Sequence, residues 1–83
     1  MKVQLKLFAS LEDCLPAGAK KNTVALTVVN TSTPLQIIDA HHIPRDSAHL
    51  VLLNGVYIDP ADRDKPIIKD GDVLAIWPPV AGG

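Results

Sequence analysis

The stretch LVLLNGVYI (residues 50–58) decides how this chain folds. Asn54 and Gly55 separate two apolar runs, and Asn-Gly in that setting is the strongest short-range signal for a β-hairpin with a two-residue turn. Such a turn places Leu52 opposite Tyr57 on one face of the hairpin, because side chains alternate between the two faces of a strand. Two antiparallel strands are therefore predicted here, and the rest of the sheet is worked out from them.

Three further strands are predicted on either side of this hairpin. VQLKLF (residues 3–8) alternates apolar and polar side chains, which is typical of a strand with one buried face. TVALTVV (residues 23–29) is rich in β-branched residues, which favour strands. VLAIW (residues 73–77) is the last strand, since Pro78 and Pro79 cannot donate to a sheet ladder and must end it.

One short helix is predicted between the second and third strands. Thr33 suits the N-cap and Pro34 the first helical position. Leu35, Ile38 and His42 then fall on one helical face at spacings of three and four residues. The residue before a proline disfavours helix, and Pro44 therefore ends this helix by about His42.

The predicted order is strand, strand, helix, strand, strand, strand. A mixed sheet of about five strands with one short helix packed on one face is an α+β fold, and this order fits the β-grasp, or ubiquitin-like, arrangement. With 83 residues the chain forms one domain. We predict a β-grasp domain over residues 1–77 and a flexible C-terminal tail over residues 78–83.

Composition excludes several classes of protein. The formal net charge is −1, whereas nucleic-acid binders carry a strong basic excess, so no nucleic-acid partner is expected. The single cysteine, Cys14, precludes an internal disulfide and is expected to be an inert thiol. No signal peptide and no apolar run long enough to span a membrane is recognised, so a cytoplasmic protein without membrane contacts is expected.

The three aromatic residues mark a candidate binding surface. Phe8 is in phase with the polar side of its strand, and Tyr57 shares its side with Leu52. If Leu74 and Ile76 point to the helix, Trp77 also lies on the face that the helix leaves open. We therefore predict that Phe8, Tyr57 and Trp77 form a partner-binding patch on that face. The alternative is that Phe8 closes one end of the core and Trp77 covers a sheet edge.

The tail WPPVAGG (residues 77–83) points to chemistry at the chain end. The two prolines favour an extended conformation, and glycine lacks a Cβ, so the tail suits a narrow channel in another protein. A carboxylate reacts as an acyl donor only after activation, and this chain has no phosphate-binding loop or catalytic constellation of its own. We predict that the tail inserts into a partner and that Gly83 presents the reacting carboxylate. The inserted residues would be Pro78, Pro79, Val80, Ala81 and Gly82.

Three stretches carry a resemblance that spans essentially the whole chain: LKLFASLEDCLP, LVLLNGVYI and KDGDVLAIWPPVAGG. The chain resembles the ubiquitin-like sulfur carriers, namely the small subunit of molybdopterin synthase and the sulfur carrier of thiamine thiazole synthesis. The ending is closer to the molybdopterin branch, where an aromatic residue commonly precedes the two prolines. The stretch HHIPRDSAHLVLLNG looks more like the thiazole-type carriers.

This resemblance implies that Gly83 is adenylated and converted to a thiocarboxylate that donates sulfur, with molybdopterin (molybdenum or tungsten cofactor) biosynthesis as the expected pathway. An E1-like adenylyltransferase would use ATP for the activation, and a sulfurtransferase or cysteine desulfurase would supply the sulfur. The large subunit of molybdopterin synthase, or an equivalent enzyme, would accept it. The family's sheet-face patch maps onto Phe8, Tyr57 and Trp77, and no bound cofactor or metal is implied. The chain itself would be a co-substrate or small subunit and not an enzyme.

Other readings remain open from the sequence. The same tail serves sulfur transfer to a thiazole precursor, or a ubiquitin-like modifier joined to proteins through Gly83. A plain β-grasp interaction module would not use the tail at all. Asp39, His41, His42 and His49 lack the spacing of a known metal motif, and no metal site is predicted there.

Overall fold

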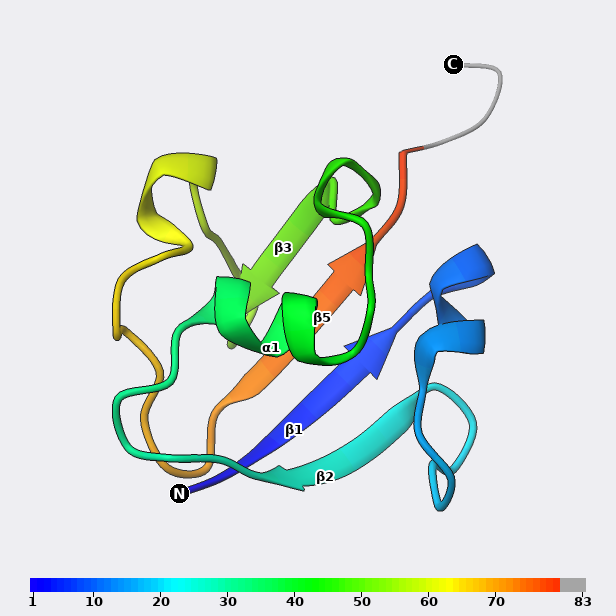
Figure 1. The fold of residues 1–83 in the computed structure, drawn as a ribbon, viewed down its shortest axis with the longest axis horizontal. Coiled ribbons are helices and arrows are strands. Elements are labelled where there is room, and N and C mark those ends of the chain that lie inside the picture. Colours follow the sequence, from blue (N-terminus) through cyan, green and yellow to red (C-terminus); the bar gives the residue numbers. More distant parts are fainter. Residues whose placement is uncertain (80–83) are drawn as a thin grey trace.

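The computed structural model describes residues 1–79 and contains the predicted strands and helix in the predicted order (Figure 1). Short 3₁₀ helices at Ala9–Cys14, Arg45–Ser47 and Pro60–Asp62 connect them. The strands and the helix are β1 (Lys2–Leu7), β2 (Thr23–Thr27), α1 (Pro34–Ala40), β3 (Leu50–Leu53), β4 (Val56–Tyr57) and β5 (Val73–Trp77).

The five strands form one mixed sheet in the order β2-β1-β5-β3-β4. The central pair β1 and β5 runs parallel, and the other neighbours are antiparallel. Helix α1 crosses one face of this sheet, while β2 lies at an edge away from it (Figure 1). The predicted α+β class and the β-grasp arrangement are confirmed.

The β3–β4 hairpin has the predicted turn and register. Asn54 and Gly55 both have positive φ angles, of 52° and 83°, as a type I′ turn requires. Leu52 pairs with Tyr57 across the hairpin. The Asn54 side chain also accepts the Val73 N–H at 2.9 Å, and this bond ties the turn to the start of β5.

Helix α1 begins as predicted but ends earlier. Thr33 is the N-cap: its hydroxyl accepts the Gln36 N–H at 3.1 Å, and the Gln36 side chain accepts the Thr33 N–H at 2.9 Å. The prediction that His42 belongs to the apolar face is wrong. Seven residues make only about two turns, so the seventh position after Leu35 falls beyond the helix. His42 is exposed, with a φ of 58°. Ile38 is buried as predicted, and Pro34 and Ile37 complete the buried face of the helix.

The core lies between α1 and the sheet, and the two central strands β1 and β5 supply five of its twelve buried side chains. Its buried side chains are Val3, Leu5, Leu7, Leu11, Ile37, Ile38, Ile43, Ala48, Val51, Ile68, Leu74 and Ile76. The inward side chains of β2, Val24 and Leu26, are only partly buried, because α1 does not extend over that edge. Within residues 1–79, no helix has the length and apolarity needed to cross a bilayer.

Candidate functional site

The sheet face opposite α1 carries the three aromatic residues. Leu74 and Ile76 are 1% and 0% exposed and belong to the core, so Trp77 projects to the other face of β5. Tyr57 lies on that same face, because it pairs with Leu52 and Leu52 pairs with Ala75. The sequence placed Trp77 on the open face only if Leu74 and Ile76 point to the helix, and in the structure they do.

Phe8 and Trp77 form a face-to-face stack at one end of this face. Their ring centroids are 4.1 Å apart and the ring planes differ by 1°. Both backbones are fixed: the Phe8 N–H donates to the Ile76 carbonyl at 3.2 Å, and the Trp77 carbonyl accepts the His49 N–H at 3.1 Å. The pair therefore holds a defined apolar surface, with both side chains half-buried, at the point where the chain leaves the sheet.

Leucines of β3 extend this surface from the stack toward Tyr57. Leu50 pairs with Trp77 and is 37% exposed, and Tyr57 is 51% exposed. Leu52 lies between them on the same face, next to Ala75 of β5. We call Phe8, Leu50, Leu52, Tyr57 and Trp77 the open-face patch. Leu50 was missed in the sequence, although its alternation with Leu52 already placed it on the Tyr57 side.

Arg63, which the sequence analysis also missed, supports the Tyr57 end of the patch. Its side chain is buried, with the whole residue 7% exposed, and its guanidinium carbon lies 5.8 Å from the centroid of the Tyr57 ring. The Nε donates to the Ile58 carbonyl at 3.0 Å and Nη1 to the Ala48 carbonyl at 2.8 Å. No carboxylate of residues 1–79 forms an ion pair with the guanidinium. The hydrogen bonds to backbone carbonyls therefore compensate for the burial of its positive charge.

The histidines and Asp39 do not gather into a site. Asp39 binds the Arg45 guanidinium at 2.8 Å, and this contact keeps the pKa of the Asp39 carboxyl below its usual range, mainly through the hydrogen bond. His41 Nδ1 lies 2.8 Å from the Ile37 carbonyl. The described part of the chain contains no group of three or more potential metal ligands.

The tail starts directly beside the aromatic stack. Pro78 follows Trp77 and is half-buried, and Pro79 is exposed. The remaining residues of the predicted tail, Val80, Ala81, Gly82 and Gly83, lie outside the described residues. The open-face patch and the start of the tail thus occupy the same end of the sheet.

The family model of the ThiS family matches residues 5–83 of this chain. The chain belongs to the ThiS family. The match includes the patch residues and the Gly-Gly ending, and it confirms the resemblance to the ubiquitin-like sulfur carriers. In a comparison with curated proteins, none matches this ThiS-family chain significantly.

Solved structures agree with the family and the fold. SAMP1 from Haloferax volcanii is 28% identical over the full length of both chains, with a TM-score of 0.66. The HVO 2177 protein of the same organism is 22% identical over 100% of this chain and 87% of its own, with a TM-score of 0.77. A chain in the complex of subunits 1 and 2 of the molybdopterin-converting factor from Helicobacter pylori is 23% identical over both full lengths, with a TM-score of 0.58. The last two structures, at 22% and 23% identity, show only that the fold is shared.

These findings define the protein at the level of its family. It is a ubiquitin-like sulfur carrier or protein modifier of the ThiS type, built on a β-grasp domain.

Proposed function

We propose that this protein is a sulfur carrier whose terminal Gly83 is adenylated and then converted to a thiocarboxylate. The observation that carries the proposal is the family match through residue 83, which includes the Gly-Gly ending after Trp77, Pro78 and Pro79. The open-face patch supports it, because a docking surface at the base of the tail would orient the tail toward a partner's active site.

The proposed chemistry follows from the properties of a carboxylate. Its oxygen is a poor leaving group, so an E1-like adenylyltransferase transfers AMP from ATP to the Gly83 carboxylate and releases pyrophosphate. The outer sulfur of a persulfide on a sulfurtransferase or cysteine desulfurase then attacks the acyl carbon and displaces AMP, which gives an acyl disulfide. A second thiol attacks the enzyme sulfur of that disulfide, releases the Gly83 thiocarboxylate and is left in a disulfide with the enzyme. The carrier contributes the acyl group and the recognition surface, and the partner enzymes contribute the catalytic residues and ATP.

The open-face patch is proposed as the docking surface for these partners. Phe8 and Trp77 supply rigid aromatic area, which is the kind of residue that dominates binding energy in protein interfaces. Leu50 and Tyr57 extend that area across β3 and β4. Pro78 and Pro79 then lead away from the patch, and the residues up to Gly82 are proposed to enter the partner's channel.

We place the acceptor in molybdopterin biosynthesis, with a large synthase subunit as partner. The aromatic residue before the two prolines supports this branch. The Helicobacter pylori complex pairs subunit 1 of a molybdopterin-converting factor with subunit 2, so a chain of this fold occurs there in a two-subunit complex. The second candidate is a protein modifier conjugated through Gly83, which the likeness to SAMP1 favours.

Intact-mass spectrometry tests the carrier chemistry. The full chain is incubated with ATP, a sulfide or persulfide source and the E1-like enzyme from the same cell. A mass increase equal to replacement of one oxygen by sulfur, located at Gly83 by fragmentation, is the expected result. Lysine-linked adducts on other proteins would support the modifier instead, and the absence of any product would leave an interaction module.

Two variants make this test specific to the tail. One extra residue after Gly83, or Gly82→Ala with Gly83→Ala, should abolish thiocarboxylate formation while thermal unfolding stays unchanged. Full activity of the extended chain would contradict the proposal. Thiocarboxylate carrier is then offered separately to a molybdopterin synthase large subunit and to a thiazole synthase, and the branch is assigned to the enzyme that consumes it.

A further inference from the structure

The outer edge of β2 carries backbone groups that have no partner in residues 1–79. β2 is an edge strand and pairs only with β1. Gln4 is the residue opposite Ala25, and its N–H donates to the Asp72 carbonyl on the side of β5. Gln4 and Ala25 are therefore not hydrogen-bonded to each other. In such a pair the N–H and carbonyl of Ala25 point away from β1, toward the outer edge of the sheet. At the other end, the Val28 N–H donates to the Met1 carbonyl and therefore points inward.

The alternation of pairs along an antiparallel ladder determines which way the other backbone groups of β2 point. Thr27, the last residue of β2, lies opposite Lys2 in the same kind of pair as Gln4–Ala25, so its N–H and carbonyl also face outward. Thr23 also faces outward, but its N–H and carbonyl both bond to Lys20, so the loop before β2 closes the edge at that end. The Val29 carbonyl accepts the Ser32 N–H at 3.0 Å. The free edge of β2 therefore runs from Ala25 to Thr27, a distance of about 7 Å at the rise of an extended strand.

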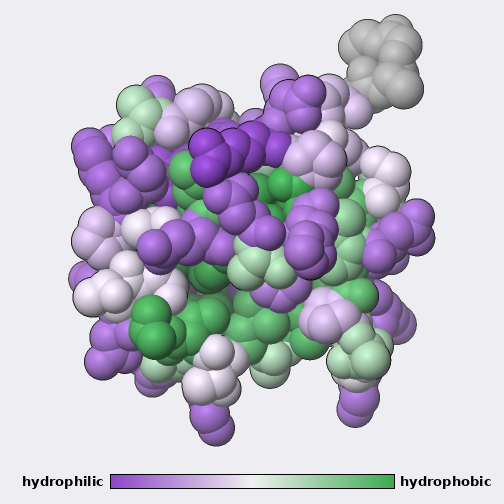
Figure 2. Space-filling view, viewed as in Figure 1, coloured by the Kyte–Doolittle hydropathy of each residue, from purple (hydrophilic) through white to green (hydrophobic). Residues whose placement is uncertain are grey.

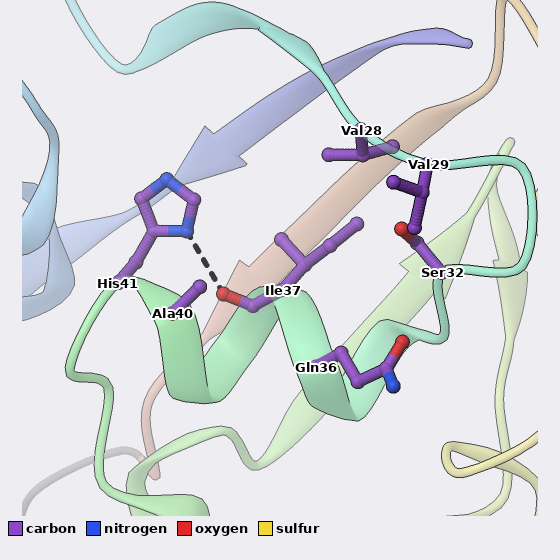
Figure 3. A pocket seen from close by; sticks show the side chains of 7 residues that line it. All are labelled: Val28, Val29, Ser32, Gln36, Ile37, Ala40 and His41. Atoms are coloured by element: carbon purple, nitrogen blue, oxygen red, sulfur yellow. Dashed lines mark hydrogen bonds between the residues drawn. The ribbon is translucent and has the colours of Figure 1, made fainter.

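An apolar groove lies beside this edge, on the helix side of the sheet. It has a volume of about 320 Å³ and lies between α1 and the segment that follows β2. Figure 3 shows Val28 and Val29 on one wall and Ile37 and Ala40 of α1 on the other. Val29 is 70% exposed, the largest exposed fraction of any large apolar side chain among the described residues. Figure 2 shows hydrophobic atoms gathered on this face of the molecule between α1 and β2.

Lysines flank the edge at both ends. The sequence contains no Asp or Glu between Asp13 and Asp39, and Lys20 and Lys21 stand immediately before β2. Lys2 pairs with Thr27 and is exposed at the other end of the strand. On the adjoining elements, Asp39 is bound to Arg45, and the Asp70 side chain accepts the Lys2 backbone N–H at 2.6 Å.

We propose that the free edge of β2 binds an extended segment of a partner protein that has apolar side chains at alternate positions and acidic residues at its ends. The segment adds to the sheet as an additional strand next to β2. Its backbone exchanges hydrogen bonds with Ala25 and Thr27, and its inward side chains fill the groove against Val28 and Ile37. Strand addition of this kind draws affinity from main-chain hydrogen bonds and specificity from alternate side chains.

The charge pattern favours this occupant over a second copy of the chain. Two copies paired through β2 would bring two sets of the same lysines along one edge, and like charges oppose such pairing. An acidic-ended segment instead places its carboxylates next to Lys2, Lys20 and Lys21. This binding uses neither the tail nor the open-face patch, so it does not depend on the proposed sulfur chemistry.

The test titrates ¹⁵N-labelled full-length protein with a capped synthetic peptide of alternating valine and threonine, with two aspartates at each end. Amide signals of Ala25, Thr27 and Val29 should shift together with those of Ile37 and Ala40. Shifts confined to Phe8 and Trp77, or no shift at millimolar peptide, would overturn the proposal. So would β2 shifts that depend on protein concentration without peptide, because they would assign the edge to a second copy.

Matched variants separate strand addition from simple groove filling. A peptide N-methylated on its central amides keeps its side chains and should bind about tenfold more weakly, because it has lost its backbone donors. Equal binding of both peptides contradicts the proposal even if no protein variant folds. Thr27→Pro removes only an outward N–H and should weaken binding, while Thr27→Val should not. Lys20→Glu with Lys21→Glu should weaken binding about three- to tenfold, and added salt should reduce the difference.

Discussion

Arg63 is the residue on which several separate segments converge. Its guanidinium donates to the carbonyls of Ile58 and Ala48, and more weakly to that of His49 at 3.3 Å. Its own carbonyl accepts the Leu35 N–H at 2.8 Å, in the first turn of α1. The buried side chain thus connects the end of β4 with the segment before β3, and the backbone of the same residue binds the start of the helix.

Replacement of Arg63 should therefore be costly to the fold. Arg63→Met keeps the apolar stem but leaves buried carbonyls without a donor, and we expect the free energy of unfolding to fall by about 2–4 kcal/mol. Urea denaturation followed by circular dichroism measures this change. Tyr57→Phe is the control: it removes only the Arg63–Tyr57 contact at 3.4 Å and should cost less than about 0.5 kcal/mol. Equal losses for both variants would show that the guanidinium stabilises Tyr57 and not the loop carbonyls.

The sequence could predict the Asn54–Gly55 turn but not Arg63. A type I′ turn is encoded by the two residues that adopt it, so the signal is local. Arg63 binds backbone carbonyls, which every residue carries, and its partners lie up to 15 positions away in sequence. No pattern of residue types records such contacts. Leu50 is an intermediate case, because the alternation within β3 was present but was not applied to the patch.

Among the elements, α1 depends most on its ends. A helix of seven residues is too short to be stable on its own, so the capping box of Thr33 and Gln36 satisfies a large share of its free donors. Thr33→Val keeps the shape of the side chain but loses the acceptor, and it should lower the free energy of unfolding by about 1 kcal/mol. Thermal unfolding measures the loss. Thr31→Val, at an exposed neighbouring position, should be nearly neutral.

The C-terminal end of α1 is held by the Asp39–Arg45 pair, which predicts a pH dependence. The pKa of Asp39 is lowered from 3.8 chiefly by its hydrogen bond to Arg45, so the pair stabilises the fold above the ordinary carboxyl range. That contribution is lost as the pH falls through the lowered pKa. Melting temperatures of wild type and Asp39→Asn should differ slightly at about pH 6 and converge at about pH 2. The effect is small because both side chains are exposed, and a gap that persists in acid would contradict it.

The start of α1 was predictable and its end was not. Thr33 and Pro34 are residues with specific roles at a helix start. The end is set instead by the left-handed turn at His42, after which Ile43 enters the core. That packing is a tertiary effect, and it overrides the helical spacing that had included His42.

At the scale of the whole molecule, the sheet separates two surfaces. The open-face patch and the start of the tail lie on one face, and the groove beside β2 lies on the helix side. The single tryptophan belongs to the patch, so its fluorescence reports on partners that dock there. The two-layer arrangement of helix on sheet was predicted from the order of the elements alone. It produces one sheet face covered by α1 and one that α1 leaves open.

Removal of the aromatic stack should impair partner docking with little effect on the fold. For Phe8→Ala we expect kcat/KM for adenylation by the E1-like enzyme to fall by about ten- to thirtyfold, as for a residue that dominates an interface. A coupled pyrophosphate assay measures it. Val29→Ala, which shortens an exposed side chain on the opposite face, is the matched control and should leave adenylation unchanged. Similar losses in both variants would mean that the adenylating enzyme does not bind the open-face patch.

If the two surfaces are separate, their variants should act independently. Phe8→Ala should retain peptide binding at β2, and Thr27→Pro should retain adenylation at Gly83, because Thr27 lies opposite Lys2, at the other end of β1 from Phe8. Protein saturated with the β2 peptide should also be adenylated at the unliganded rate, since the peptide leaves Trp77 and Pro78 uncovered. Inhibition by the unmodified peptide, but not by its N-methylated form, would instead show that strand addition at β2 is coupled to the tail. The β2 edge would then be a regulatory site for the carrier and not a separate docking surface.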